Sequence, residues 1–117
     1  MVQDWPELTK ALTADVRQLR AGAPDVMKAF GSLAVTAGAA KALDAKTKEL
    51  IALAIGVSTR CDDCIAFHAK AAVDHGATRD EVMETLGMAI YMGAGPSAMY
   101  ASHALAAFNQ FSAAKAG

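Results

Sequence analysis

The sequence has no excess of charge of either sign. Its 117 residues contain 11 Lys and Arg against 12 Asp and Glu, for a net charge of −1. These residues are interspersed along the chain, and no basic cluster occurs. Proteins whose main partner is nucleic acid or an anionic membrane usually carry such a cluster. The sequence therefore argues against both partners.

Long apolar segments are also missing. The longest apolar run, LIALAIGV at 50–57, is far shorter than the roughly 20 residues that a helix needs to cross a bilayer. The N-terminal segment carries Asp4 and Glu7 and has no apolar core, so it does not resemble a signal peptide. We therefore expect a soluble, cytoplasmic protein.

Aromatic residues are scarce at 6%, and there are only three prolines. We find no repeat, no low-complexity linker and no strand-like alternation. Alanine, the best helix former, supplies 28 of the 117 residues. The sequence predicts an all-α fold with a single domain over residues 1–117.

Turn and capping residues divide the chain into about six helices. Pro24 and Pro96 suit a first helical turn, Asp44 suits an N-cap, and Gly76 suits the left-handed residue after a helix. Thr78, followed by Glu three positions later, predicts a capping box. The expected helices cover about 6–20, 24–38, 45–58, 61–75, 79–92 and 96–113.

Several side chains are expected to be structural. The helix at 45–58 is apolar on every side from 50 to 57, which predicts a buried, central helix. His75 and His103 have no chemical neighbour in the sequence, and Tyr91 and Tyr100 fit either a pocket wall or ordinary packing. We expect four methionines in the core of their helices: Met83, Met88, Met92 and Met99.

Both cysteines lie in one short segment, RCDDCIAFHAK at 60–70. At about 100° per residue, Cys61, Cys64 and His68 share one stripe of a helix that begins near Cys61. The helix N-terminus favours a thiolate there, whereas Asp62 and Asp63 oppose it. In the cytoplasm a lone CxxC is more often redox-active or metal-binding than a structural disulfide.

The preceding helix contributes a carboxylate. If helices 45–58 and 61–75 form an antiparallel hairpin that turns near Thr59, Glu49 and His68 are about equally distant from the turn. This spacing predicts a contact between Glu49 and His68, and a chain of proton acceptors that continues to Cys64 and Cys61.

Other interpretations of these residues stay open. Lys46 and Lys48 are also consistent with Glu49 in a solvated first turn, and the cysteines could be small buried hydrophobes. The cysteines, Glu49 and His68 could offer zinc two sulfurs, an oxygen and a nitrogen, but no second Cys/His pair exists at structural-site spacing. A c-type haem site is excluded because Ile65 follows the second cysteine.

The segment KELIALAIGVSTRCDDCIAFHAKAAVDHGATRDEVME resembles the core motif of AhpD-like alkylhydroperoxidases, within the carboxymuconolactone decarboxylase superfamily. The pattern is a Glu, a CxxC that begins twelve residues later, and a His four residues after the second cysteine. Glu49, Cys61, Cys64 and His68 match it throughout. The likeness, which also includes GAGPSAMYASHAL, extends over about residues 24–110.

The resemblance implies an all-α protein that assembles as a homotrimer or homohexamer and reduces organic hydroperoxides without a cofactor or metal. It implies that Cys64 attacks the peroxide and that Cys61 then forms a disulfide with it. Glu49 and His68 are implied to relay the proton, and a dithiol such as a lipoyl group to re-reduce the pair.

The sequence departs from the well-studied peroxidases at Asp63, where those proteins carry a second histidine. An anion at this position disfavours a neighbouring thiolate. Two alternatives remain beside a peroxidase or disulfide reductase. One is a carbon–carbon lyase, although the superfamily's decarboxylases generally lack the CxxC. The other is a non-enzymatic helical oligomer or metal-binding module.

Overall fold

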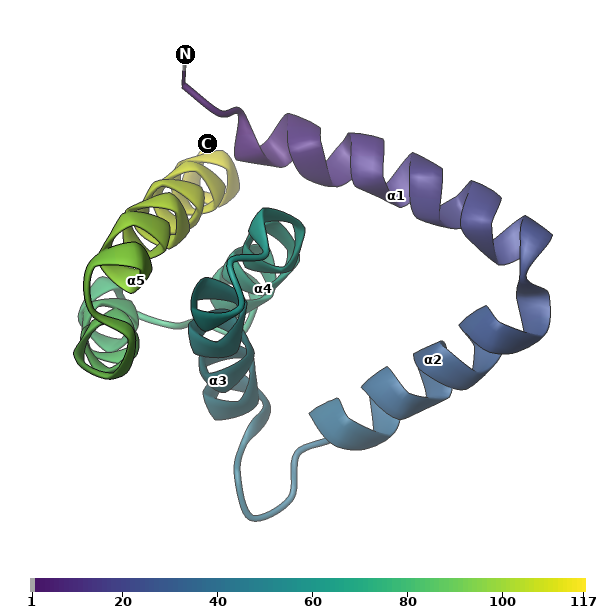
Figure 1. The fold of residues 1–117 in the computed structure, drawn as a ribbon, viewed down its shortest axis with the longest axis horizontal. Helices are drawn as coiled ribbons and strands as arrows, with labels where there is room; N and C mark the ends of the chain where they lie inside the picture. The colour runs from purple at the N-terminus through teal and green to yellow at the C-terminus, as the bar shows by residue number, and fades with distance from the viewer. Residues whose placement is uncertain (1) are drawn as a thin grey trace.

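The computed structural model describes residues 2–117, and these residues form five helices and no strands (Figure 1). The all-α prediction is therefore confirmed. The helices are α1 (Trp5–Gly22), α2 (Pro24–Gly38), α3 (Ala45–Ser58), α4 (Asp62–Asp74) and α5 (Arg79–Ala116).

The sequence predicted two helices where the structure has α5. The predicted loop near 93–96 is instead a kink, because only Ala94 leaves the helical conformation, with φ 56° and ψ −140°. Pro96 follows two residues later and falls in the first turn of the second segment, where its missing N–H costs no helical hydrogen bond. The predicted break is thus present, and the two helical segments that meet at the kink together make up α5.

The predicted caps form as expected. The Asp44 carboxylate accepts the N–H of Thr47 at 2.7 Å, and hydrogen bonding with the side chain and then the backbone of Thr47 lowers the pKa of Asp44. Thr78 and Glu81 satisfy each other's backbone N–H groups in a capping box, and Gly76 has φ 80°. Each cap fixes where a helix of the bundle begins or ends.

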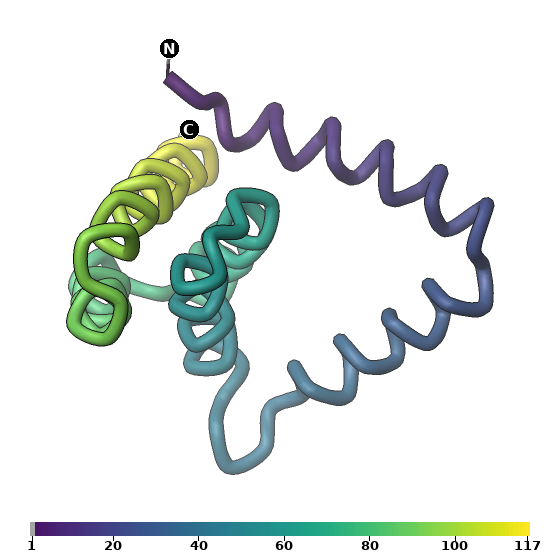
Figure 2. The backbone as a smooth tube through the Cα atoms, viewed as in Figure 1, coloured from purple at the N-terminus to yellow at the C-terminus, as the bar shows by residue number. Residues whose placement is uncertain are grey.

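Helices α3, α4 and α5 pack together around one core, which lies on one side of the molecule (Figure 2). Four large side chains there have no exposed surface, and each such burial stabilises the fold by roughly 1.5–3 kcal/mol. They are Leu53, Val57, Ile65 and Val82. Small residues complete the contacts between helices, among them Ala66, Ala69, Ala104 and Ala107. The high alanine content therefore allows the helices to approach closely.

Helices α1 and α2 form an arm that bends away from this bundle (Figure 1). The first turn of α1 is anchored, because Trp5 is buried in the core and its backbone N–H donates to Oε1 of Gln110 at 2.8 Å. By contrast, α2 has no buried residue. Its C-terminal end is held by Lys48, whose Nζ donates to the carbonyls of Ala37 and Ala39 at 2.9 and 2.7 Å.

Two burial predictions are wrong for the single chain. The helix α3 is not buried on every side, because 43% of Ile51 and 56% of Ile55 is exposed. The four methionines are not in the core: Met83, Met88, Met92 and Met99 are 40–76% exposed. The first part of α5 faces the core with a different stripe, formed by Val82, Leu86 and Ala89 at helical spacing.

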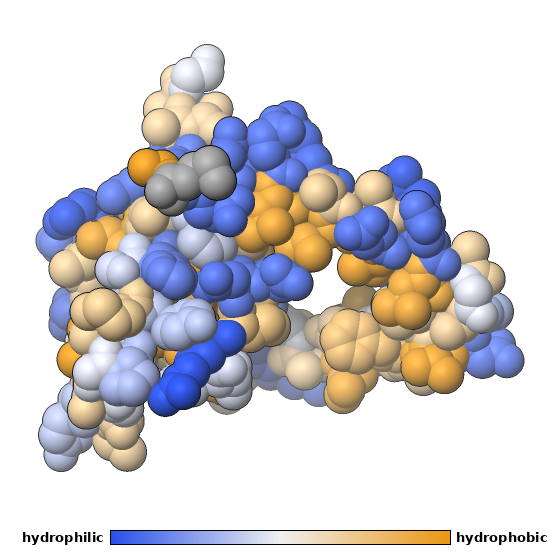
Figure 3. Space-filling view, turned by 45° about the horizontal axis from the view of Figure 1, so that its top comes forward, coloured by the Kyte–Doolittle hydropathy of each residue, from blue (hydrophilic) through white to orange (hydrophobic). Residues whose placement is uncertain are grey.

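Apolar side chains also border the opening between the arm and the bundle, which Figure 3 shows as a gap that side chains do not fill. Within residues 2–117, no helix has the length and apolar character needed to cross a membrane.

Candidate functional site

The cysteine segment begins directly after the tight turn that ends α3. Arg60 has φ 58°, and its N–H donates to the carbonyl of Val57, while the N–H of Cys61 donates to that of Gly56 at 2.9 Å. This pair of hydrogen bonds is the Schellman arrangement, which ends α3 and reverses the chain within three residues. The reversal places α4 directly beside α3.

Close packing at the turn depends on Gly56. A Cβ atom at this position would lie 3.4 Å from the Cβ of Cys64 and 3.5 Å from the backbone nitrogen of Ile65. A single methyl group would thus be in van der Waals contact with the start of α4, and a larger side chain would have no room there. The cysteine pair is positioned by this contact.

Cys61 is the N-cap of α4, and its Sγ accepts the N–H of Cys64 at 3.1 Å. The two sulfurs also form a disulfide with each other, with a Cα–Cα distance of 5.2 Å. Both residues are half-buried. The predicted helix started at Cys61, one residue early, because a cap residue lies just outside the helix it begins.

The predicted contact between the two helices is present. Nδ1 of His68 lies 3.1 Å from Oε2 of Glu49, and 38% and 21% of these side chains are exposed. An ionised carboxylate only accepts hydrogen bonds, so Nδ1 carries the proton and Nε2 is left available to exchange one. This is the carboxylate–imidazole arrangement that a proton relay requires.

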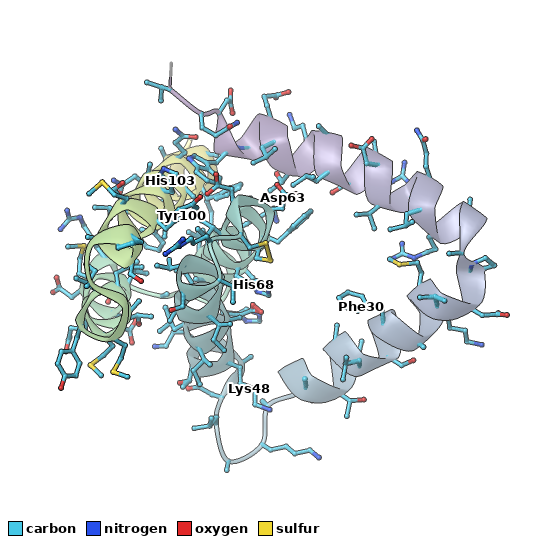
Figure 4. The ribbon with its side chains drawn as sticks, viewed as in Figure 1. Phe30, Lys48, Asp63, His68, Tyr100 and His103 are labelled. Atoms are coloured by element: carbon cyan, nitrogen blue, oxygen red, sulfur yellow. A yellow bond between two sulfur atoms is a disulfide. The ribbon has the colours of Figure 1, made fainter. Side chains whose placement is uncertain are left out.

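A mainly apolar cavity of about 450 Å³ lies next to this pair, between α2 and α3. Figure 4 shows His68, Lys48 and Phe30 around the space that these helices border. The polar lining of the cavity comes from Lys48, Glu49 and His68. Its other lining residues are Ala34, Ala37, Gly38, Leu43, Ile51, Ala52 and Ile55. A small apolar molecule could therefore reach the imidazole from this cavity.

The two aspartates between the cysteines differ in their surroundings. Asp63 is exposed, whereas Oδ1 of Asp62 lies 2.8 Å from Nδ1 of His103 on α5. No sequence pattern predicted this second contact, because 41 residues separate its partners. His75, by contrast, is the C-cap of α4, at the end opposite the cysteines.

The zinc alternative finds no geometric support in residues 2–117. No group of three or more His, Cys, Asp or Glu side chains in this range is arranged to hold a metal ion. The cysteine sulfurs, which this alternative needs as thiolate ligands, are joined to each other.

The comparison with protein families agrees with the motif. Residues 24–107 match the model of the carboxymuconolactone decarboxylase family. The chain belongs to the carboxymuconolactone decarboxylase family. This match confirms the superfamily that the cysteine motif indicated, and it includes the whole arrangement from α2 into α5.

Two relatives are similar to this protein along most of the chain. An uncharacterized protein of Cupriavidus necator is 47% identical over 90 residues, which are 77% of this chain and 80% of the relative. An uncharacterized protein of Haemophilus influenzae is 40% identical over 109 residues, which are 93% and 96% of the two chains.

Solved structures of family members share the fold. The crystal structure of a carboxymuconolactone decarboxylase family protein from Legionella pneumophila is 50% identical, with a TM-score of 0.90 and coverage of 92% of this chain and 96% of that one. A family protein from Thermotoga maritima, described as a candidate for a role in antioxidative response, is 26% identical. Its TM-score is 0.82, and the coverage is 94% and 93%.

Proposed function

We propose that this protein is a cytoplasmic, thiol-dependent peroxidase or disulfide reductase that uses Cys61 and Cys64 to reduce organic hydroperoxides. The observation that carries the proposal is the hydrogen bond between His68 and Glu49 on the hairpin that also presents the cysteine pair. An oriented imidazole near two bonded cysteines is suited to moving protons during thiol oxidation and reduction. The apolar cavity beside His68 fits the hydrocarbon part of such a peroxide.

In the proposed reaction, the thiolate of Cys64 attacks the terminal peroxide oxygen and the O–O bond breaks. Cys64 becomes a sulfenic acid, and the alkoxide takes a proton through His68 to leave as an alcohol. The Cys61 thiol then displaces water from the sulfenic acid and forms the disulfide. An external dithiol, such as a lipoyl group, finally reduces the disulfide and becomes a cyclic disulfide itself.

A thiol count tests this proposal directly. The protein is reduced, its free thiols are counted with a colorimetric reagent, an organic hydroperoxide is added, and the thiols are counted again. We expect both thiols to disappear as one intramolecular disulfide and to return with a dithiol. Persistence of both thiols together with activity on a lactone acid would instead favour the lyase, and protection by one bound zinc per site would favour a metal module.

Two cysteine variants test the assigned roles. Cys64→Ser should abolish peroxide consumption, because it removes the attacking sulfur. Cys61→Ser should leave a sulfenic acid at Cys64 that a dimedone-type reagent traps, because the resolving thiol is gone. Equal and unimpaired peroxide consumption by both variants would refute these roles.

A further inference from the structure

A second carboxylate–imidazole pair lies at the beginning of α4, one residue after Cys61. Oδ1 of Asp62 and Nδ1 of His103 are 2.8 Å apart, and both side chains are a little under half exposed. Since an ionised carboxylate only accepts, His103 donates from Nδ1 to Asp62. This places an N–H donor directly against one of the two carboxylates in the cysteine motif.

The imidazole is held in place from several sides. Its ring lies 4.9 Å from the ring of Tyr100 and 6.2 Å from that of Trp5, measured between centroids. Figure 4 shows His103 and Tyr100 next to each other on α5. Trp5 itself is buried, which fixes this wall of the site. The position of His103 is thus set by packing against α1 and by α5 itself.

Among residues 2–117, no other charged side chain lines the cavity beside this pair. A cavity of about 360 Å³ at this end of the molecule is lined by Asp62 and His103 together with uncharged residues, including Gln3 and Ser102. Tyr100, on the same helix as His103, is the further titratable group in contact with the imidazole. Within this cavity, His103 is therefore the group that offsets the charge of Asp62.

The position of Asp62 on α4 matters for the cysteines. On the helical wheel Asp62 is about 160° from Cys64. Its hydrogen bond to α5 holds the carboxylate on the side of α4 that faces away from His68. Asp63, in contrast, is exposed and directly precedes Cys64 in the chain. A carboxylate near a thiol disfavours the thiolate, so the two aspartates should affect the cysteines unequally.

We propose that His103 is a positioning residue for the cysteine pair: it holds and offsets Asp62, and thereby favours the thiolate form of the reduced cysteines. This inference rests on the proposed function only in treating the cysteines as a redox pair. Since a more stable thiolate also stabilises the reduced state, His103 should raise the reduction potential of the disulfide.

The test compares His103→Gln with the wild-type protein in two measurements, neither of which uses peroxide. One is the pH titration of the thiolate by its ultraviolet absorbance, and the other is the reduction potential in dithiothreitol redox buffers. We expect His103→Gln to lower the thiolate fraction near the titration midpoint about threefold and to make the reduction potential more negative. This is the size of effect expected when the partly screened charge of Asp62, one residue from Cys61, is no longer offset.

Variants of the two aspartates show whether the effect passes through Asp62. His103→Gln should change neither quantity in an Asp62→Asn background, but should keep its effect in an Asp63→Asn background. The single variants give an independent test that leaves His103 intact: Asp63→Asn should increase the thiolate fraction more than Asp62→Asn, because the charge of Asp62 is already offset.

Three results would overturn the inference. The first is that His103→Gln changes only thermal stability. The second is that His103→Gln still changes the thiolate fraction or the reduction potential in the Asp62→Asn background. The third is that Asp62→Asn and Asp63→Asn increase the thiolate fraction equally. The proposed function fails separately, if the reduced wild-type protein does not lose its thiols to hydroperoxide.

Discussion

At the scale of single residues, Asp63 sets this protein apart from the peroxidases that its motif resembles. Those proteins have a histidine between the cysteines, whereas here an exposed carboxylate precedes Cys64 in the first turn of α4. A carboxylate suits the positive end of a helix but disfavours a thiolate beside it. The same side chain thus stabilises α4 and works against the proposed chemistry.

Restoring the histidine should therefore increase reactivity. In Asp63→His we expect peroxide-driven loss of thiols to be about 3- to 10-fold faster than in the wild type, because an anion next to Cys64 is replaced by an imidazole. Stopped-flow measurement of thiol loss would show this. Asp63→Asn separates the removal of charge from the gain of an imidazole, and should give only part of the increase. A rate for Asp63→His at or below that of the wild type would contradict this account.

At the scale of helices, the hairpin of α3 and α4 brings the site together. Glu49 and His68 meet because the Schellman turn at Arg60 reverses the chain and Gly56 lets the two helices touch. The order of the contacts along the hairpin is fixed by sequence distance from the turn. A change at the closest point of approach should therefore disturb both the fold and the cysteine pair.

Gly56→Val tests this contact. A Cβ at this position is already in van der Waals contact with Cys64 and Ile65, so the two further methyl groups of valine overfill the space. We expect a loss of about 1–3 kcal/mol in unfolding free energy and slower oxidation of the cysteines. Chemical denaturation and the thiol count would measure the two effects. Gly87→Val is the matched control, since a Cβ at Gly87 meets nothing within 4 Å. Similar losses in both variants would show that the close approach is unimportant.

The sequence was sufficient to predict the features that depend on local signals or on a single turn. Caps, helix positions and the Glu49–His68 contact follow from residue types and from counting outward from Thr59. The pairing of Asp62 with His103 could not be found in this way, because it depends on how α5 lies across the start of α4. Nor could the kink at Ala94 be distinguished from a loop, since Gly and Pro signal either.

At the scale of the whole molecule, the exposed apolar surface is too extensive for an isolated chain of this size. Helix α2 has no buried residue, although several of its side chains are large and apolar. More than half of the surface of each is exposed in Val26, Phe30, Leu33 and Val35. Exposed apolar patches of this kind mark surfaces that other proteins cover. The methionines of α5 are exposed in the same way. The sequence analysis placed them in the core because periodicity identifies an apolar helix face, but it does not identify which surface covers that face.

We therefore predict that the protein forms a homotrimer or homohexamer in which α2 contacts a neighbouring copy. Light scattering should give a mass several times 12.1 kDa. Phe30→Glu should reduce the mass to that of a monomer, because a charge at such an interface is desolvated without a partner. Lys28→Glu, an exposed position on the same helix, should leave the assembly intact. A monomeric wild-type protein would contradict the prediction.

One atom of the hairpin has two functions. The sulfur of Cys61 belongs to the disulfide and also accepts the N–H that caps α4. A thiolate accepts a hydrogen bond more strongly than a neutral sulfur does, since charge-assisted hydrogen bonds are stronger. The first turn of α4 should thus be most firmly closed while Cys61 is a thiolate and looser once its charge is lost to the disulfide. The stability of the first turn of α4 should therefore depend on the oxidation state of the cysteine pair.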